Sequence, residues 1–206
     1  PRTGIDRKAL RGLLAKCSPK ALICVPDFQN PLGSRMPADA KAELYKLATK
    51  HDLPIIEDYV YGELAYDGKI APTLKQLDRK GNVILLSSFS KILSPGLRIG
   101  WVVGGKWSAH IRNLKFVNTL SNPGLLQAAT ARYLRSGGLD RHLRRLRGTL
   151  QSQMLVYQNE VARSFPDGTR FTRPEGGFVL WAELPEKVDC VKLHAVALDE
   201  LAKEQI

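Results

Sequence analysis

The chain has 206 residues, of which 44% are hydrophobic and 25% charged, a composition that is ordinary for a globular protein and sufficient to bury a core. This argues against a disordered tail or a fibre, and no run approaches the roughly 18–20 apolar residues of a membrane span. The first residues lack the basic and then apolar plan of a signal peptide. We therefore expect a soluble, cytoplasmic protein without a membrane segment.

Positive charge is unevenly distributed along the chain. The net charge is +11, and residues 105–150 hold nine Lys or Arg against one acid, Asp140. This excess is compatible with an anionic partner, but a solvated or dimer-facing helix surface is the favoured explanation, because the arginines show no aromatic interleaving and no base-reading motif. The three cysteines form no CxxC pair, so the sequence indicates neither a disulfide framework nor a metal site.

The first half of the chain alternates between short apolar runs and helical patterns. We expect helices over 5–15, 37–51 and 73–77, and strands over 21–25, 54–58, 82–87 and 98–103. Nearly continuous apolar strands separated by helices are typical of an α/β fold with a largely parallel sheet flanked by helices. In such sheets, binding sites gather at the carboxyl ends of the strands.

The second half is mainly helical and ends in a different pattern. Helices are expected over 107–119, 123–136 and 139–164, followed by strands over 170–172 and 177–183 and a helix over 189–203. The longest helix has one apolar face, formed by Leu139, Leu143, Leu146, Leu150, Met154 and Tyr157. We expect a large domain over 1–138, an inter-domain helix over 139–164 and the beginning of a small α+β domain over 165–206. No closing strand is evident, so we expect the chain to be a piece of a longer protein.

A turn motif follows the first strand. Residues 26–33 read PDFQNPLG, in which proline and glycine enforce a turn. The side-chain amide of Asn30 can donate a hydrogen bond to an oxygen in the crevice beside the sheet. An ordinary turn without a binding role is the alternative.

A carboxylate pair ends the second strand. The apolar run over 54–56 continues into Glu57 and Asp58, and Tyr61 follows three residues later. Asp58 is either a helix N-cap or a fixed charge directed at a ligand. On a helical turn, Tyr61 can present its phenol on the same side as Asp58.

A lysine in a serine-rich turn follows the third strand. Residues 87–101 read SSFSKILSPGLRIGW, which places Lys91 after the strand and Arg98 seven residues later. Hydroxyl groups and a guanidinium around a lysine are suited to holding an anion. A lysine that forms a Schiff base with an aldehyde cofactor, whose phosphate and ring nitrogen are bound by neighbouring groups, would use all of these residues. For the tetrapeptide SFSK alone, a surface-loop lysine is the alternative.

The set QNPxG, EDxxY and SFSKx4GLRxGW resembles the fold-type I, pyridoxal-phosphate-dependent aminotransferases of classes I and II, over nearly the whole chain. The resemblance implies that Lys91 forms the Schiff base with pyridoxal phosphate and acts as general base, and that Asp58 pairs with the pyridinium nitrogen. It implies that Asn30 and Tyr61 bind the phenolic oxygen of the cofactor, with Tyr61 part of the catalytic set. The residues implied to hold the phosphate are Ser88, Ser90 and Arg98.

Longer phrases are similar to the C-terminal domain of MocR-type regulators of the GntR family. These are PDFQNPLGSRMP, IIEDYVYGEL, FSKILSPGLRIGW, SGGLDRHLRRLR and RPEGGFVLWAELP. In that family, an aminotransferase-like domain follows an N-terminal winged helix-turn-helix and senses an effector. The implied partners are a small amino compound, DNA through a fused winged helix that these residues do not contain, and a second copy of the protein in a homodimer.

A free-standing aminotransferase that moves an amino group between an amino acid and a 2-oxo acid is the alternative, because the same site residues serve both functions. The family pattern also contains a glycine-containing phosphate turn and a ring-stacking aromatic, which we expect before Pro1. Its substrate-carboxylate arginine is expected after Ile206.

Overall fold

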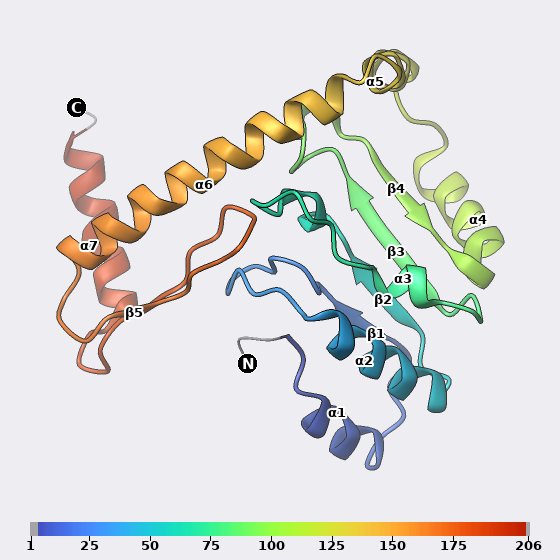
Figure 1. Cartoon of the computed structure of the whole chain (residues 1–206), viewed down its shortest axis with the longest axis horizontal. Coiled ribbons are helices and arrows are strands. Elements are labelled where there is room, and N and C mark those ends of the chain that lie inside the picture. The colour runs from blue at the N-terminus through green and yellow to red at the C-terminus, as the bar shows by residue number, and fades with distance from the viewer. Residues whose placement is uncertain (1–3, 205–206) are drawn as a thin grey trace.

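Four strands form one mixed sheet in the computed structural model, which describes residues 4–204 and their side chains up to residue 200 (Figure 1). In spatial order they are β1 (Leu22–Cys24), β2 (Ile55–Asp58), β3 (Val83–Ser88) and β4 (Gly100–Val103). β1, β2 and β3 run parallel, and β4 pairs antiparallel with β3. This confirms the expected α/β fold with a largely parallel sheet.

Three helices accompany these strands: α1 (Arg7–Leu14) precedes β1, α2 (Ala38–Lys50) connects β1 to β2, and α3 (Leu74–Leu77) lies between β2 and β3. Local signals set their ends: the Asp6 side chain caps α1, and Thr73 forms a capping box with Gln76 at the start of α3. Leu44 of α2 packs with buried sheet residues such as Ile55 in the first hydrophobic core. The helices therefore fix one face of the sheet.

The chain then continues into α4 (Ser108–Thr119), α5 (Gly124–Arg135) and α6 (Gly138–Ser164). Gly137 turns the chain between α5 and α6 with a left-handed φ of +66°. Figure 1 shows α6 extending away from the sheet toward the C-terminal segments. The apolar face expected on this helix is buried at Leu143 and Met154, but Tyr157 is 63% exposed, so the buried stripe ends before it.

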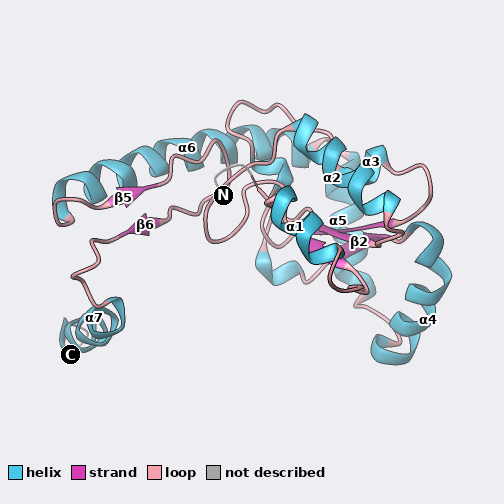
Figure 2. Cartoon of the chain, turned by 90° about the horizontal axis from the view of Figure 1, so that it is seen from below, coloured by secondary structure: helices cyan, strands magenta, loops and turns pink. Residues whose placement is uncertain are grey.

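The last part contains β5 (Arg170–Phe171) and β6 (Ala182–Glu183), which pair antiparallel, and α7 (Cys190–Glu204) (Figure 2). The strand expected over 177–183 is wrong for most of its length. Glu175 and Gly177 make backbone hydrogen bonds with the loop after β2 instead of with a strand ladder, and Gly177 has a φ of +73°. Among the described residues, no helix is both long and apolar enough to cross a membrane.

Candidate cofactor site

The three sequence motifs meet on a second hydrophobic core at the carboxyl ends of β1, β2 and β3. Each motif contributes a buried aromatic residue to this core: Phe28 from the turn after β1, Tyr61 from the loop after β2, and Phe89 from the turn after β3. Ile92, next to Lys91, is buried in the same core. Apolar anchors therefore hold the polar functional residues at one edge of the sheet.

The turn that carries Asn30 is closed by two backbone hydrogen bonds. The Gly33 N–H donates to the Gln29 carbonyl at 2.6 Å, and the Gln29 N–H donates to the Ser34 carbonyl at 3.2 Å. Gly33 has a φ of +64°, and a Cβ at this position would lie 2.9 Å from the Val179 carbonyl oxygen, so the turn requires glycine. Asn30 itself is exposed at the tip of this turn.

A buried ion pair between Lys41 and Asp27 supports the same turn. Lys41 of α2 is fully buried, and its Nζ donates to Asp27 Oδ2 at 2.7 Å and to the Pro72 carbonyl at 2.9 Å. The other Asp27 oxygen has no hydrogen bond and lies 3.7 Å from Arg35 Nε. Burial raises the pKa of Asp27, although the Lys41 ammonium acts in the opposite direction.

The two carboxylates at the end of β2 have different surroundings. Glu57 is buried and accepts hydrogen bonds from the backbone N–H groups of Leu74 and Lys75, both at 2.8 Å, so it anchors the start of α3. Burial raises the pKa of Glu57, and these hydrogen bonds partly oppose that rise. Glu57 therefore has a structural role.

Asp58 lies on the opposite side of the strand from Glu57 and is half-buried. Its Oδ1 accepts a hydrogen bond from the Val60 N–H at 3.1 Å, within the turn after β2. The next helical element, a short 3₁₀ helix over Gly62–Leu64, has Tyr61 at its N-cap position. Asp58 is therefore not a helix N-cap, and that alternative is wrong.

The turn after β3 brings Ser88, Ser90 and Arg98 together. The Ser90 N–H donates to Ser88 Oγ at 3.4 Å, and the Arg98 guanidinium donates to Ser90 Oγ at 3.5 Å and to the Pro95 carbonyl at 3.4 Å. Arg98 has a left-handed φ of +51°, which is uncommon for a residue other than glycine and is often found at functional sites. The two hydroxyl groups and the guanidinium thus form one cluster of hydrogen-bond donors.

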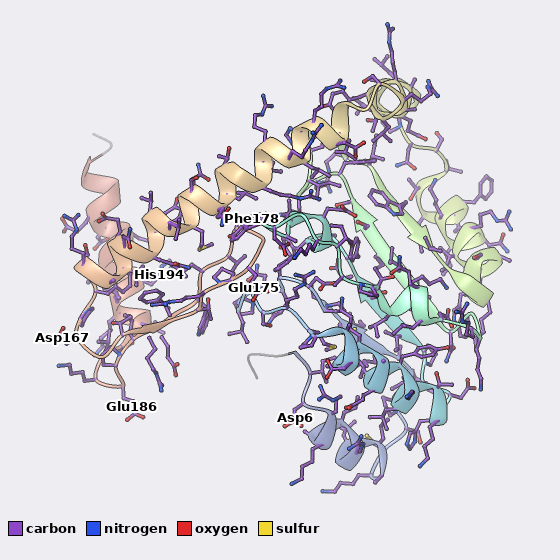
Figure 3. All side chains as sticks on the ribbon, in the orientation of Figure 1. Asp6, Asp167, Glu175, Phe178, Glu186 and His194 are labelled. Carbon is purple, nitrogen blue, oxygen red and sulfur yellow. The ribbon has the colours of Figure 1, made fainter. Side chains whose placement is uncertain are left out.

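Lys91 and Tyr61 meet at a residue to which the sequence assigned no role, Phe178. Lys91 is exposed, and its Nζ lies 6.0 Å from the centroid of the Phe178 ring. The Tyr61 ring packs edge-on against the same ring, with the centroids 5.6 Å apart. Figure 3 shows Phe178 and Glu175 where the segment between β5 and β6 reaches the loop after β2. The Gly176–Gly177 pair before this aromatic residue is the signal that could have identified it.

The donor set suits pyridoxal phosphate. Among the described residues, the Asn30 amide, the Tyr61 phenol and the Lys91 amine make no side-chain hydrogen bond, and only one Asp58 oxygen makes one. The Lys91 amine suits the aldehyde of the cofactor, the Asn30 amide and the Tyr61 phenol suit its phenolic oxygen, and the Asp58 carboxylate suits its ring nitrogen. The cluster of Ser88, Ser90 and Arg98 suits the phosphate. These side chains and the cofactor are therefore chemically complementary.

Two hollows on the surface lie beside this site rather than in it. One of about 520 Å³ lies between the turn after β1 and the β5–β6 region, where Arg170 and Trp181 line it. A second of about 490 Å³ adjoins the start of α2. None of the seven residues predicted for the site lines either hollow.

Comparisons with known proteins give a consistent result. The family described as aminotransferase class I and II matches residues 1–205. The HTH-type transcriptional regulator YjiR of Escherichia coli is 41% identical over 93% of this chain and 41% of its own length. The 2-aminoadipate transaminase of Thermus thermophilus is 34% identical over 96% of the chain and 50% of its own length.

Among solved structures, the α-aminoadipate aminotransferase LysN of Thermus thermophilus, complexed with N-(5'-phosphopyridoxyl)-L-leucine, superposes with a TM-score of 0.91 and 32% identity. That comparison covers 97% of this chain and 52% of the LysN chain. The chain therefore spans about half the length of the proteins that it matches.

Proposed function

This chain belongs to the aminotransferase class I and II family, and we propose that it is the pyridoxal-phosphate-binding, effector-sensing domain of a MocR/GntR-type transcriptional regulator. The observation that carries the proposal is the similarity to the regulator YjiR across 93% of the chain. Lys91, Asp58 and the other five predicted site residues lie at one edge of the sheet, which supports a site that binds the cofactor.

The proposed roles follow from the chemistry of each side chain. When bound, pyridoxal phosphate supplies an aldehyde carbon and an electron-accepting ring. Lys91 would attach the cofactor through Nζ, and the negative charge of Asp58 would keep a proton on the ring nitrogen. The phosphate would accept hydrogen bonds from Ser88, Ser90 and Arg98.

Asn30 and Tyr61 would complete the site by binding the phenolic oxygen of the cofactor. The Asn30 amide and the Tyr61 phenol are both hydrogen-bond donors, so they suit a phenolic oxygen that carries negative charge. Lys91, once an amino compound takes its place, would be free to move a proton at the Cα of that compound. The same residues thus support sensing of an amino compound and catalysis.

We further propose the organisation of the whole protein. DNA binding would come from a winged helix fused to this domain, in a cytoplasmic homodimer. Exposed apolar side chains on α6, Leu155, Val156 and Tyr157, support an additional partner surface. Residues 1–138 would be part of a large cofactor-binding domain, 139–164 an inter-domain helix, and 165–206 the beginning of a small domain. Sedimentation of the full-length protein tests the dimer.

A free-standing aminotransferase remains the second candidate function. The 34% identity to a 2-aminoadipate transaminase favours it, because that relative is named as an enzyme. The site residues do not discriminate between the two candidates. The discriminating property is whether occupancy of the site changes DNA affinity.

The test uses the full-length protein and a DNA site selected from random sequence. We expect pyridoxal phosphate, alone or with an amino compound, to change DNA affinity by about fivefold or more, the usual size of an allosteric coupling. A Lys91→Ala variant should lose this response, and Lys46→Ala, at an exposed lysine of α2 away from the site, should keep it. Steady production of 2-oxo acids with no change in DNA affinity would establish the enzyme instead.

A further inference from the structure

The segment that carries Phe178 is fixed to the loop after β2, although more than 100 residues separate them. The Tyr66 N–H donates to the Glu175 carbonyl and the Gly177 N–H donates to the Leu64 carbonyl, both at 3.0 Å. The Tyr66 hydroxyl adds a third hydrogen bond, to the Gly177 carbonyl at 3.0 Å. The position of Phe178 is therefore set by the same loop that presents Tyr61.

Close packing also fixes this segment. A Cβ at Gly176 would lie 2.5 Å from Phe28 Cζ and 2.6 Å from the Leu64 carbonyl oxygen, so only glycine fits there. Phe28 belongs to the core below the Asn30 turn. The backbone before Phe178 thus rests directly on the site's own core.

The Phe178 ring is a large apolar surface placed among polar functional groups. It is 44% exposed, and its neighbours are the Tyr61 ring at 5.6 Å and the Lys91 amine at 6.0 Å. A rigidly held aromatic ring that remains exposed beside reactive groups is suited to contact a ligand.

We propose that Phe178 determines which amino compounds the site accepts, and that it selects those with an apolar or aromatic side chain. The inference rests on the proposed function. An amino compound that takes the place of the Lys91 amine brings its own nitrogen to the region of Nζ. The first carbons of its side chain then lie within reach of the Phe178 ring, where apolar groups lose contact with water.

The same geometry disfavours acidic side chains. The face of an aromatic ring carries negative partial charge, so a carboxylate gains no attraction there and loses hydration. A cationic side chain would be attracted to the ring face, but its ammonium loses hydration there, and Lys91 Nζ, 6.0 Å from the ring centroid in this structure, adds a like charge nearby. Selection of apolar over charged compounds is the consequence.

The experiment measures dissociation constants of phenylalanine, leucine, aspartate and lysine for the full-length protein loaded with pyridoxal phosphate, by titration of its visible absorbance. We expect wild type to bind phenylalanine and leucine about tenfold or more tightly than aspartate and lysine. Phe178→Ala should weaken phenylalanine binding about tenfold and change aspartate binding less than twofold. Phe178→Tyr should retain the preference, and Phe171→Ala serves as the control for loss of a ring on β5.

The outcomes separate this inference from the proposed function. Wild type that takes up no pyridoxal phosphate overturns both. If wild type takes up the cofactor but prefers aspartate or lysine, or if Phe178→Ala weakens all four amino acids equally, only the inference is overturned. The inference is supported if Phe178→Ala loses the preference for phenylalanine and leucine while its cofactor content, measured by absorbance per chain, is unchanged.

Discussion

Replacement of Lys41 by methionine tests how the turn that carries Asn30 is supported. Methionine retains most of the volume of the lysine side chain but removes the ammonium that lies 2.7 Å from Asp27 Oδ2. Asp27 then remains buried with Arg35 as its nearest cation, at 3.7 Å. Removal of one partner of a buried ion pair typically costs about 3–5 kcal/mol. Since a domain is stable by about 5–15 kcal/mol, we expect a large loss of the free energy of unfolding.

The loss should depend on pH in a defined direction. Burial already raises the pKa of Asp27 in the folded wild type, and loss of the Lys41 charge removes an effect that lowers it. In Lys41→Met, the folded state therefore takes up a proton at a higher pH than the unfolded state does. Protonation stabilises the folded variant, so the destabilisation should shrink as the pH falls below neutral.

Equilibrium urea unfolding of wild type, Lys41→Met and Lys41→Met/Asp27→Leu measures both effects. The double variant buries no charge at this pair, so it should lose much less stability than Lys41→Met. Lys46→Met, on the exposed side of α2, is the matched control and should lose less than about 1 kcal/mol. A loss below about 1 kcal/mol in Lys41→Met, or an equal loss in the double variant, would refute the reasoning.

Contacts of three other residues lead to measurable predictions. Gly176→Ala should lower stability by about 1–3 kcal/mol, seen as a lower melting temperature, because its Cβ overlaps Phe28; an unchanged melting temperature contradicts this. Burial alone would raise the pKa of Asp78, but hydrogen bonds from the Val83 and Asn82 amides and the Lys75 ammonium hold it at about 2. Wild type should thus lose stability as pH falls from about 4 to about 2, and Asp78→Asn should lack this part of the acid dependence in urea unfolding. Asp58→Asn should keep the fold and weaken pyridoxal phosphate binding about tenfold, measured by equilibrium dialysis. If the variant binds the cofactor as tightly as wild type, the charge of Asp58 does not contribute to binding.

The sheet was predictable because its strands begin as short, nearly continuous apolar runs separated by helical patterns. The runs at 21–25 and 54–58 contain β1 and β2, and the run at 82–87 overlaps β3, which begins and ends one residue later. Parallel pairing follows from the helices between the strands. Since parallel strands present their carboxyl ends at one edge, the sequence also predicted where the site residues gather.

The rest depends on contacts between distant segments. Nothing near residue 177 indicates that its N–H bonds to Leu64, which is why a strand was expected there. The position of Phe178 beside Tyr61 and Lys91 depends on the same long-range contacts, and the Gly176–Gly177 pair is its one local signal. Lys41 resembles any other lysine on an amphipathic helix, and only the structure shows that it is buried against Asp27. The two readings of Asp58 could be separated only when its partner, the Val60 N–H, was known.

One experiment locates the lysine to which the cofactor attaches. The full-length protein is incubated with pyridoxal phosphate, reduced with borohydride, digested and analysed by mass spectrometry. We predict one labelled peptide with the pyridoxyl group on Lys91, and no label at the corresponding position in a folded Lys91→Ala variant. A label on other lysines of the chain with none on Lys91, or equal total labelling of wild type and Lys91→Ala, would contradict the account.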